Sequence, residues 1–337
     1  KSNFVDIPTD CPQRDERMGW TGDINVFAPT ALYNFELSRF LEKWLRDVKA
    51  EQRPGGGIPN TVPVQGYGFP ATMPEMAVDW WGDACVNVPW ALYEATGSID
   101  ILRTMYPTMQ KYVKACRFWA GFGIGKHRYI WHTPSVLHFG DWVAPDVPKM
   151  SQWQARSKYT ATASLFYTSS RLAAIARILG KDQDAALYTD LSRKVADAYC
   201  SVFTDGSGRV KDEFQTAYVL PLYLNMYNAG LVSTNIGFII ARSGLQVSIS
   251  ILVITSFVKT VPRELEEAAT IDGCGKFQTF WHIVFPLLKP INATQLVLNT
   301  VYVWNDYNTA VVLLRDKASR TLPLAQIVYF NENTAEL

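Results

Sequence analysis

Residues 179–198 read LGKDQDAALYTDLSRKVADA, and this stretch carries the clearest fold signal in the chain. Leu187, Leu191 and Val195 recur every four residues, with charged residues between them. Apolar residues at this spacing line one face of an α-helix, while the charged residues between them face water. Gly180 precedes the run, at a position where an earlier helix would end. The stretch therefore predicts the second helix of a hairpin in a water-soluble domain.

The same arrangement occurs more than once upstream. A helical run ends at Gly97 as another does at Gly180, and a second helix-like run follows each glycine. The paired runs are 83–96 with 99–120 and 158–179 with 182–202. Helical hairpins in series are therefore predicted for about residues 23–203, and the expected fold class is all-α. The loops between the runs, RPGGGIPNTVPVQGYGFP and WHTPSVLHFGDWVAPD, are long, and long loops are more often functional than decorative.

The composition excludes several classes of function. The chain has 337 residues, with 32 basic and 31 acidic side chains and a net charge of +1, so no nucleic-acid partner is expected. Its five cysteines are widely spread and have neither disulfide nor metal-ligand spacing, so we expect no metal site and no cofactor. The chain begins at Lys1 without an apolar signal core before the first motif, so it looks cut at its start and its targeting cannot be read.

The second half has a different character from the first. Residues 214–241 carry no charge, Arg242 interrupts, 243–258 are uncharged again, and 290–305 form a shorter apolar run. Runs of this length predict membrane-spanning helices, with a buried core helix as the alternative. Between them lies a charged amphipathic segment, 261–290, which would sit outside the bilayer.

An acidic cluster near the start, DCPQRDERMGW at residues 10–20, has two interpretations. Four carboxylates lie within fourteen residues, and they are Asp10, Asp15, Glu16 and Asp23. Crowding can keep one carboxyl group protonated while Arg14 holds another ionised, and cleavage of a glycosidic bond needs two carboxylates in different protonation states. On the residues alone, a solvated turn before a helix is the commoner explanation, and an active site is the alternative.

The wider sequence resembles one enzyme family. NFVDIPTDCPQRDERMGWTGD is very similar to the signature of bacterial α-L-rhamnosidases, which are inverting glycoside hydrolases. Further segments agree in order, namely AVDWWGDACVNVPWALYEATG at 77–97, HFGDW at 138–142, the 179–198 run and VKDEFQTAYVLPL at 210–222. The resemblance covers about residues 1–220. It implies an (α/α)6 six-hairpin barrel with its site in the loops at one end, and a rhamnose-containing glycan or glycoside as the substrate.

The resemblance also implies roles for individual residues. Glu16 would be the general acid, Trp20 would line the pocket, and three residues would hold sugar hydroxyls: Asp10, Arg14 and Asp23. Further pocket residues would be Trp80, Asp83, Asp141 and Trp142. The family's general base is a glutamate beyond the QTAYVL stretch, whereas here an uncharged run follows and no matching glutamate appears. An inverting enzyme without its base cannot activate water, so we expect this part to be inactive.

The charged segment of the second half resembles another family. EEAATIDGCGKFQTFWHIVFPLLKP follows the EAA-loop pattern of binding-protein-dependent ABC importer permeases, with Phe285 in place of a leucine. In that family a short helix and a glycine turn dock on the ATP-binding subunit. The implied coupling residues are Glu267, Ala268, Ala269, Gly273, Ile283 and Pro286. The motifs WND and RTLP extend the resemblance to the carbohydrate subfamily, over about 218–337.

These resemblances together predict a composite chain of two incomplete domains. Residues 1–217 would be a partial α-L-rhamnosidase catalytic domain, and 218–337 a partial type-1 ABC permease, with its EAA loop at 263–290 and its transmembrane helices in the bacterial inner membrane. Its partners would be an ABC ATP-binding subunit and a second permease. Both resemblances fit LPLYL at 220–224, so we hypothesise that a deletion or an assembly error joined two neighbouring genes there. A permease subunit for carbohydrate uptake and a membrane-anchored hydrolase are the alternatives.

Overall fold

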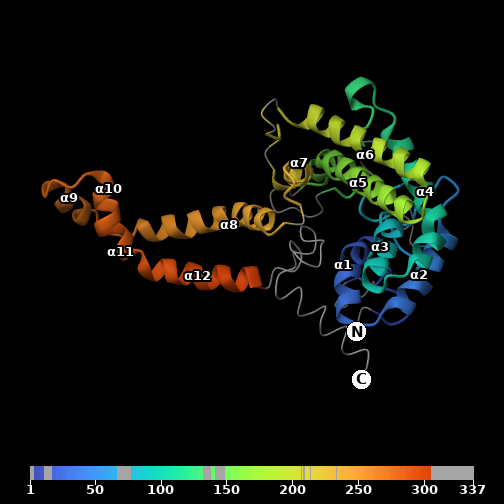
Figure 1. Cartoon of the computed structure of the whole chain (residues 1–337), viewed down its shortest axis with the longest axis horizontal. Helices are drawn as coiled ribbons and strands as arrows, with labels where there is room; N and C mark the ends of the chain where they lie inside the picture. The colour runs from blue at the N-terminus through green and yellow to red at the C-terminus, as the bar shows by residue number, and fades with distance from the viewer. Residues whose placement is uncertain are drawn as a thin grey trace. The chain divides into compact units, whose positions relative to one another are not determined.

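The structure is a computed structural model that describes residues 4–10, 17–66, 77–131, 138–140 and 149–304, apart from 206, 208, 213 and 233. The chain divides into two units, Lys1–Leu224 and Asn225–Leu337. Helices account for most of the described residues in both units, and strand pairing among these residues is limited to isolated bridges (Figure 1). The all-α prediction is therefore confirmed for the described part of the chain.

The first unit contains six long helices among its described residues. They are α1 (Thr21–Asn34), α2 (Ser38–Glu51), α3 (Ala84–Thr96), α4 (Ile99–Ala120), α5 (Met150–Ile178) and α6 (Asp182–Phe203). Helices α3–α4 and α5–α6 pack as helical hairpins. The predicted pairs of helices around Gly97 and Gly180 are confirmed, and both glycines have left-handed backbones, with φ of 72° and 69°. Helix α5 begins at Met150 rather than at the predicted residue 158.

These helices form two layers. Helices α1, α3 and α5 pack against one another, while α2, α4 and α6 cover them from the outside (Figure 1). The amphipathic outer helix α2 buries one stripe, formed by Leu41, Trp44, Leu45 and Val48. In contrast, every residue from Ala84 to Pro89 of the inner helix α3 is buried, because this helix has neighbours on more than one side. Alternation of inner and outer helices is the arrangement expected for hairpins of an (α/α) barrel.

Large aromatic side chains anchor the core of the first unit. Trp44, Tyr112, Trp131 and Tyr199 are all completely buried, and each such side chain contributes about 2–3 kcal/mol through its apolar area. Their polar atoms mostly find protein partners: the Trp44 indole donates to the Val62 carbonyl at 3.1 Å, and the Tyr199 hydroxyl donates to the Ala217 carbonyl at 2.8 Å. These bonds attach loops to the helical core.

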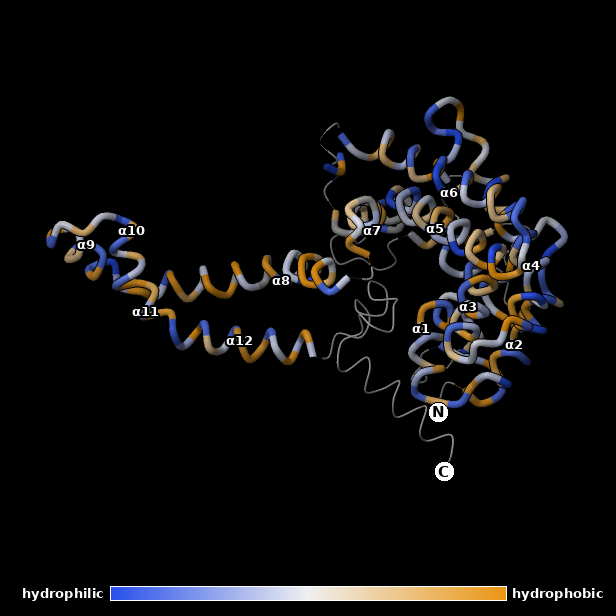
Figure 2. Tube along the Cα trace, viewed as in Figure 1, coloured by the Kyte–Doolittle hydropathy of each residue, from blue (hydrophilic) through white to orange (hydrophobic). Residues whose placement is uncertain are grey.

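The second unit is built on a helical hairpin. The first unit closes with η3 (Gln215–Tyr218), and α7 (Val219–Asn228) spans the boundary. The elements of the second unit are then α8 (Asn235–Val258), α9 (Arg263–Ile271), α10 (Lys276–Thr279), the π-helical turn η4 (Phe280–Val284), α11 (Phe285–Leu287) and α12 (Lys289–Trp304). Helices α8 and α12 run antiparallel, since Gln246 donates to Asn299 at 2.9 Å and the Arg242 guanidinium lies 4.1 Å above the Tyr302 ring. Hydrophobic residues occur along both helices (Figure 2).

The uncharged run 214–241 does not form one continuous helix. Helix α7 ends at Asn228, Gly230 turns the chain with a φ of 66°, and Thr234 caps α8 by accepting the Gly237 N–H at 3.0 Å. A glycine turn and a side-chain cap are local signals that override the apolar composition. Within the described residues, none of the helices combines the length and the apolar character needed to cross a bilayer, so the membrane-spanning helices stay a prediction.

Candidate active site

Hydrogen bonds between Asp10 and Met18 join the two ends of the acidic stretch near the start. Asp10 is 5% exposed, its N–H donates to the Met18 carbonyl at 3.0 Å, and its carboxylate accepts the Met18 N–H at 3.0 Å. A reciprocal pair of this kind brings the two ends of the intervening segment together. The predicted acid Glu16 and its neighbour Arg14 belong to that segment and lie outside the described residues. Asp10 and Met18 therefore hold together the described residues on either side of that segment.

Gly19 and Trp20 pair with a second loop. The Val62 N–H donates to the Gly19 carbonyl at 2.9 Å, and Trp20 forms a bridge with Thr61. A Cβ atom on Gly19 would lie 2.3 Å from the Val62 carbonyl oxygen, so only glycine fits this close approach. Residues 17–20 are not helical, and α1 begins at Thr21.

Gly22 has a packing role inside α1 and does not form part of a loop. A Cβ atom there would lie 2.8 Å from the Trp81 ring, so the first turn of α1 touches the indole directly. Asp23 lies in the same turn, next along the chain, and its side chain is exposed. A carboxylate at the N-terminal end of a helix is stabilised by the helix dipole, and it is accessible to a ligand.

An aromatic cluster joins three loops that are far apart in sequence. The Phe139 ring lies 4.2 Å from the Trp81 ring and 6.4 Å from the Trp20 ring, and buried Val78 completes the cluster. The three loops precede α1, α3 and α5, the helices of the inner layer. Residues 138–140 run directly into Asp141 and Trp142, which lie outside the described residues. The structure thus gathers the segments that carry the predicted site residues at the start of the inner helices.

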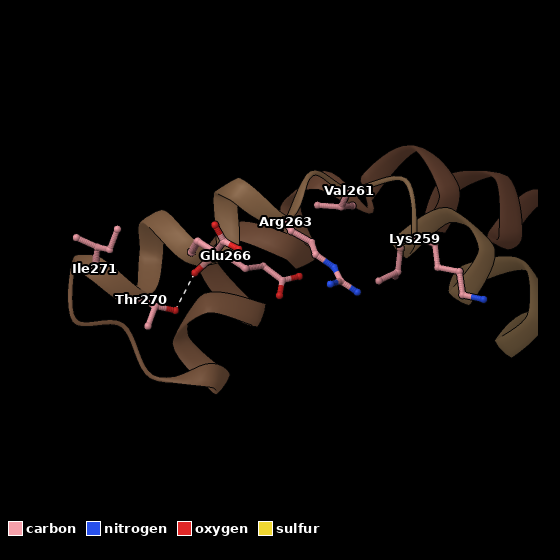
Figure 3. Close-up of a pocket in the computed structure, with 8 residues that line it drawn as sticks. Lys259, Val261, Arg263, Glu266, Thr270 and Ile271 are labelled. Atoms are coloured by element: carbon pink, nitrogen blue, oxygen red, sulfur yellow. Dashed lines mark hydrogen bonds between the residues drawn. The ribbon is translucent and has the colours of Figure 1, made fainter.

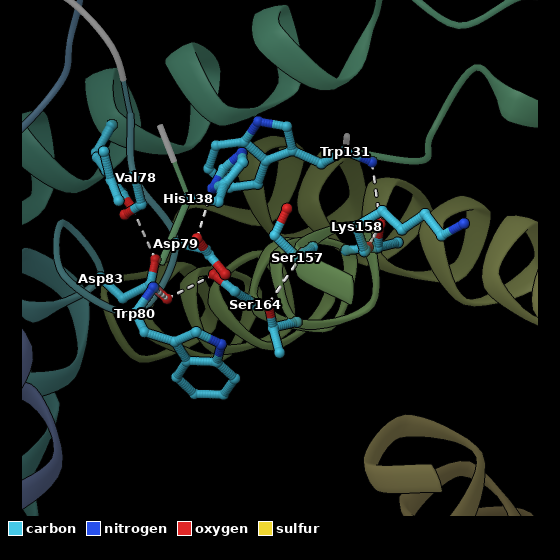
Figure 4. A network of polar contacts seen from close by, with 12 residues as sticks. Val78, Asp79, Trp80, Asp83, Trp131, His138, Ser157, Lys158 and Ser164 are labelled. Carbon is cyan, nitrogen blue, oxygen red and sulfur yellow. Dashed lines mark hydrogen bonds and ion pairs between the residues drawn. The ribbon is translucent and has the colours of Figure 1, made fainter. Parts of the chain in front are cut away.

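A buried acid–imidazole pair links two of these loops, and sequence reasoning missed it. The Asp79 carboxylate lies 2.5 Å from Nδ1 of His138, and each side chain is 1% exposed (Figure 4). The Trp131 ring packs edge-on against the imidazole at 4.7 Å. Both residues lie in motifs that were recognised, VDWWGD and HFGDW, but nothing in either motif indicates that they pair. The pair fixes residues 138–140 against the loop before α3.

Trp80 and Asp83 lie next to this pair. Trp80 is half-buried, has a positive φ of 64°, and its ring lies 6.5 Å from the Tyr167 ring. Asp83 is completely buried, and its carboxyl group accepts the Trp80 N–H at 2.9 Å. Burial raises the pKa of Asp83 to about 6, although hydrogen bonds from Ser164 and Tyr112 oppose the shift. Trp80 can present a ring to a ligand, whereas the Asp83 side chain lies behind it in the protein.

The second unit has a groove on helix α9 (Figure 3). Its volume is about 700 Å³, and it is lined by Val258, Lys259, Val261, Arg263, Glu266, Glu267, Thr270 and Ile271. Helix α9 is followed by Gly273 with a φ of 86°, as the predicted short helix and glycine turn require. Ala269 is buried, Glu267 and Ala268 are exposed, Ile283 lies half-buried in η4, and Pro286 is exposed in α11.

Comparison with known proteins gives two family matches. Residues 1–251 match the bacterial α-L-rhamnosidase six-hairpin glycosidase domain, and residues 214–335 match the inner membrane component of binding-protein-dependent transport systems. These matches confirm both resemblances seen in the sequence, and they overlap over 214–251.

Individual relatives agree with the family matches. The α-L-rhamnosidase of Streptomyces avermitilis is 38% identical over 233 residues, which are 67% of this chain and 20% of that protein. The crystal structure of native α-L-rhamnosidase from Aspergillus terreus matches with a TM-score of 0.57 and 33% identity, over 67% of this chain and 25% of that one. The melibiose/raffinose/stachyose import permease MelC of Bacillus subtilis is 39% identical over 120 residues, 35% of this chain and 44% of that protein. The chain thus spans a quarter or less of these rhamnosidases and under half of this permease.

Proposed function

The chain belongs to the bacterial α-L-rhamnosidase six-hairpin glycosidase family over residues 1–251, and on that basis we propose that its first unit holds the acid half of an inverting rhamnosidase site. The ligand is terminal α-L-rhamnose in a glycan or glycoside. Glu16 donates the proton, and the sugar is held by Asp10, Arg14, Trp20, Asp23, Trp80, Asp141 and Trp142.

One observation supports this proposal above the others. The loops that carry the family's motifs meet at one place, through the Trp20–Phe139 and Trp81–Phe139 ring contacts and the Asp79–His138 pair. Half-buried indoles can cover the apolar face of a sugar, and a neighbouring carboxyl group can protonate the departing oxygen. Asp10 and Met18 hold together the described residues on either side of the segment that would supply this acid.

Turnover is a separate question from binding. An inverting glycosidase needs a second carboxylate to deprotonate the attacking water. In the family this carboxylate is a glutamate well downstream of the QTAYVL stretch, whereas here an uncharged run follows that stretch to residue 241 and no matching glutamate appears. We therefore propose that the chain binds rhamnosides and hydrolyses them very slowly.

Binding can be measured by titration calorimetry with L-rhamnose, using L-fucose as the comparison sugar. We expect L-rhamnose to bind, and Trp20→Ala to weaken binding about three- to tenfold, because an aromatic contact contributes roughly 0.5–1.5 kcal/mol. Trp119→Ala is the matched control, since Trp119 packs against Phe118 and Phe122 near the end of α4. Equal affinity for the two sugars, or no binding at all, would refute the proposal.

Azide tests whether the general base is missing. In phenyl α-L-rhamnoside, azide can attack the anomeric carbon from the side opposite the leaving group. The bond from that carbon to the phenolic oxygen then breaks, Glu16 protonates the oxygen, and β-L-rhamnosyl azide and phenol form. We expect phenol release to depend on azide and to be lost in Glu16→Gln. Rapid release without azide would show that a base is present.

A second candidate function concerns the other unit. We propose that it is a permease element of a bacterial inner-membrane sugar importer, in which Glu267, Ala268, Ala269, Gly273, Ile283 and Pro286 contact an ABC ATP-binding subunit. Support comes from the family match and from the short helix α9 with its glycine turn. Expression with a partner permease and an ATPase should give ATP-dependent sugar uptake that Glu267→Ala abolishes. Glu264→Ala, an exposed change on the same helix, should leave uptake unchanged.

We further propose that the chain is a composite of these two parts, divided near residues 217 and 218. The overlap of the two family matches over 214–251 supports a join in this region. Long-read sequencing of the source DNA provides the test, because a single reading frame across the join would establish the composite and two complete genes would refute it. Rhamnosidase activity in the membrane fraction would instead favour a membrane-anchored hydrolase.

A further inference from the structure

The buried side chain of Asp83 makes hydrogen bonds to a loop and to two helices. One carboxyl oxygen, Oδ2, accepts hydrogen bonds from Ser164 Oγ at 2.5 Å and from the Trp80 N–H at 2.9 Å. The other oxygen, Oδ1, lies 2.8 Å from the Tyr112 hydroxyl. These contacts tie the loop before α3 to helices α4 and α5, and they leave no part of the side chain open to a ligand. Asp83 therefore acts through its neighbours and does not touch a sugar directly.

The hydrogen bonds that the Tyr112 hydroxyl can make depend on whether the Asp83 carboxyl group is protonated. The phenol has one proton, but its oxygen lies 2.9 Å from the Val78 carbonyl oxygen and 2.8 Å from Asp83 Oδ1. The phenol donates to Asp83 Oδ1 when that carboxyl group is ionised; at a pH below about 6, where Asp83 is protonated, the acid can donate to the phenol while the phenol donates to Val78. Burial of Asp83 favours the same neutral form. Gly82 allows this approach, because a Cβ atom there would lie 2.4 Å from the Tyr112 ring.

The bond from Trp80 to Asp83 holds an unfavourable backbone conformation. A left-handed φ is a true outlier for a bulky residue and costs on the order of 1–3 kcal/mol, so the surrounding structure must impose it. The Trp80 N–H is fixed by Asp83 Oδ2, while the indole extends away from the Asp83–Ser164 pair (Figure 4). The indole stays half-buried near Tyr167, whose hydroxyl is bonded to Arg171 at 2.5 Å.

We propose that Asp83 is a positioning residue, whose buried carboxyl group accepts the Trp80 N–H, locks the Val78–Asp83 turn and holds Trp80 in the left-handed conformation that presents its indole to the sugar. The part of this inference that concerns the sugar rests on the proposed function, whereas the part that concerns the Trp80 conformation does not. Several titratable groups face Asp83, namely Asp79 with its partner His138 on the loops, Cys85 on α3, and Tyr112 and Cys116 on α4.

Fluorine NMR of the full chain labelled with 5-fluorotryptophan tests the conformation. The Trp80 resonance is assigned with Trp80→Phe. We expect Asp83→Ala to shift and broaden this resonance, because the N–H loses its acceptor. Asp83→Asn should restore the wild-type position, since its amide donates to Tyr112 and its carbonyl accepts from Trp80. Tyr112→Phe provides a second test if Asp83→Ala does not fold, and it should shift the same resonance.

Glu51→Gln is the matched control, because Glu51 also accepts a loop N–H, that of Val64 at 2.9 Å, far from Trp80 in the sequence. It should leave the Trp80 resonance in place. An unchanged Trp80 resonance in both Asp83→Ala and Tyr112→Phe would overturn the proposal, as would a shift in Asp83→Asn as large as that in Asp83→Ala. L-rhamnose affinity is measured on the same variants, and we expect a loss in Asp83→Ala that Asp83→Asn recovers. If the wild-type chain does not bind rhamnose, the proposed function fails, while the resonances still decide the positioning role.

Discussion

The stability of the first unit should depend on pH through Asp83. Burial raises its pKa from 3.8 to about 6, so the folded state holds this proton more tightly than the unfolded chain does. The favourable contribution is complete below pH 4 and is lost as pH rises from about 4 to about 6. Because the two pKa values differ by roughly 2, and each pH unit corresponds to about 1.36 kcal/mol, the stability lost is about 3 kcal/mol. Asp83→Asn keeps the hydrogen bonds and has no proton to release.

The assay is urea unfolding of the wild type and Asp83→Asn at several values of pH between 3.5 and 7, followed by tryptophan fluorescence. Nine of the eleven tryptophans precede residue 154, so the signal reports mainly on the first unit. The free energy of unfolding of Asp83→Asn, relative to that of the wild type, should rise by about 3 kcal/mol across this range. Taking the difference cancels the titration of other carboxylates, and Glu51→Gln repeats the measurement at a more exposed acid. A difference that is flat with pH, or that falls, would refute the reasoning.

Two further predictions concern the loops of the candidate site. Gly19→Ala should destabilise the first unit by about 1–3 kcal/mol, because the added Cβ meets the Val62 carbonyl at 2.3 Å. Gly244→Ala adds its Cβ in open space and should not destabilise the chain. The urea midpoints of the two variants are compared, and equal midpoints would contradict the contact at Gly19. His138→Ala should cost about 3–5 kcal/mol by leaving the Asp79 carboxylate buried and unpaired, and Asp79→Asn should remove part of that cost in a double-mutant cycle. Additive effects in the cycle would mean that the two side chains are not coupled.

The helices were predictable because their signals are local. The repeat of Leu187, Leu191 and Val195 predicted helix α6, although Leu187 is exposed and the buried face holds Leu191 and Val195 together with Tyr188. Gly97 and Gly180 marked the ends of α3 and α5. Helix α9 and its Gly273 turn were predicted from the resemblance to the EAA loop of ABC importer permeases. Local signals also place the division of the uncharged run, for which one or two membrane-spanning helices were predicted: Gly230 and Thr234 separate α7 from α8.

The membership of the candidate site stays a prediction, because Arg14, Glu16, Asp141 and Trp142 lie outside the described residues. The motifs predicted that the segments around Trp20, Trp80 and Phe139 belong together, and ring contacts join these segments in the structure. The motifs did not reveal that Asp79 pairs with His138, nor that Asp83 is enclosed behind Trp80. An aspartate in a sequence motif can face a ligand or, like Asp83, the phenol of Tyr112, and the motif does not distinguish the two.

The sequence alone determined the hairpin plan and the family of each part, because helical periodicity, glycine stops and motif spacing depend on residues near one another in the chain. Only the tertiary structure decided which side chains share a proton or a buried contact. Asp79 meets His138 across 59 positions, and Asp83 meets Ser164 across 81, once the inner helices have packed. Burial then raises the pKa of Asp83, and burial is a property of the assembled layers rather than of any one segment.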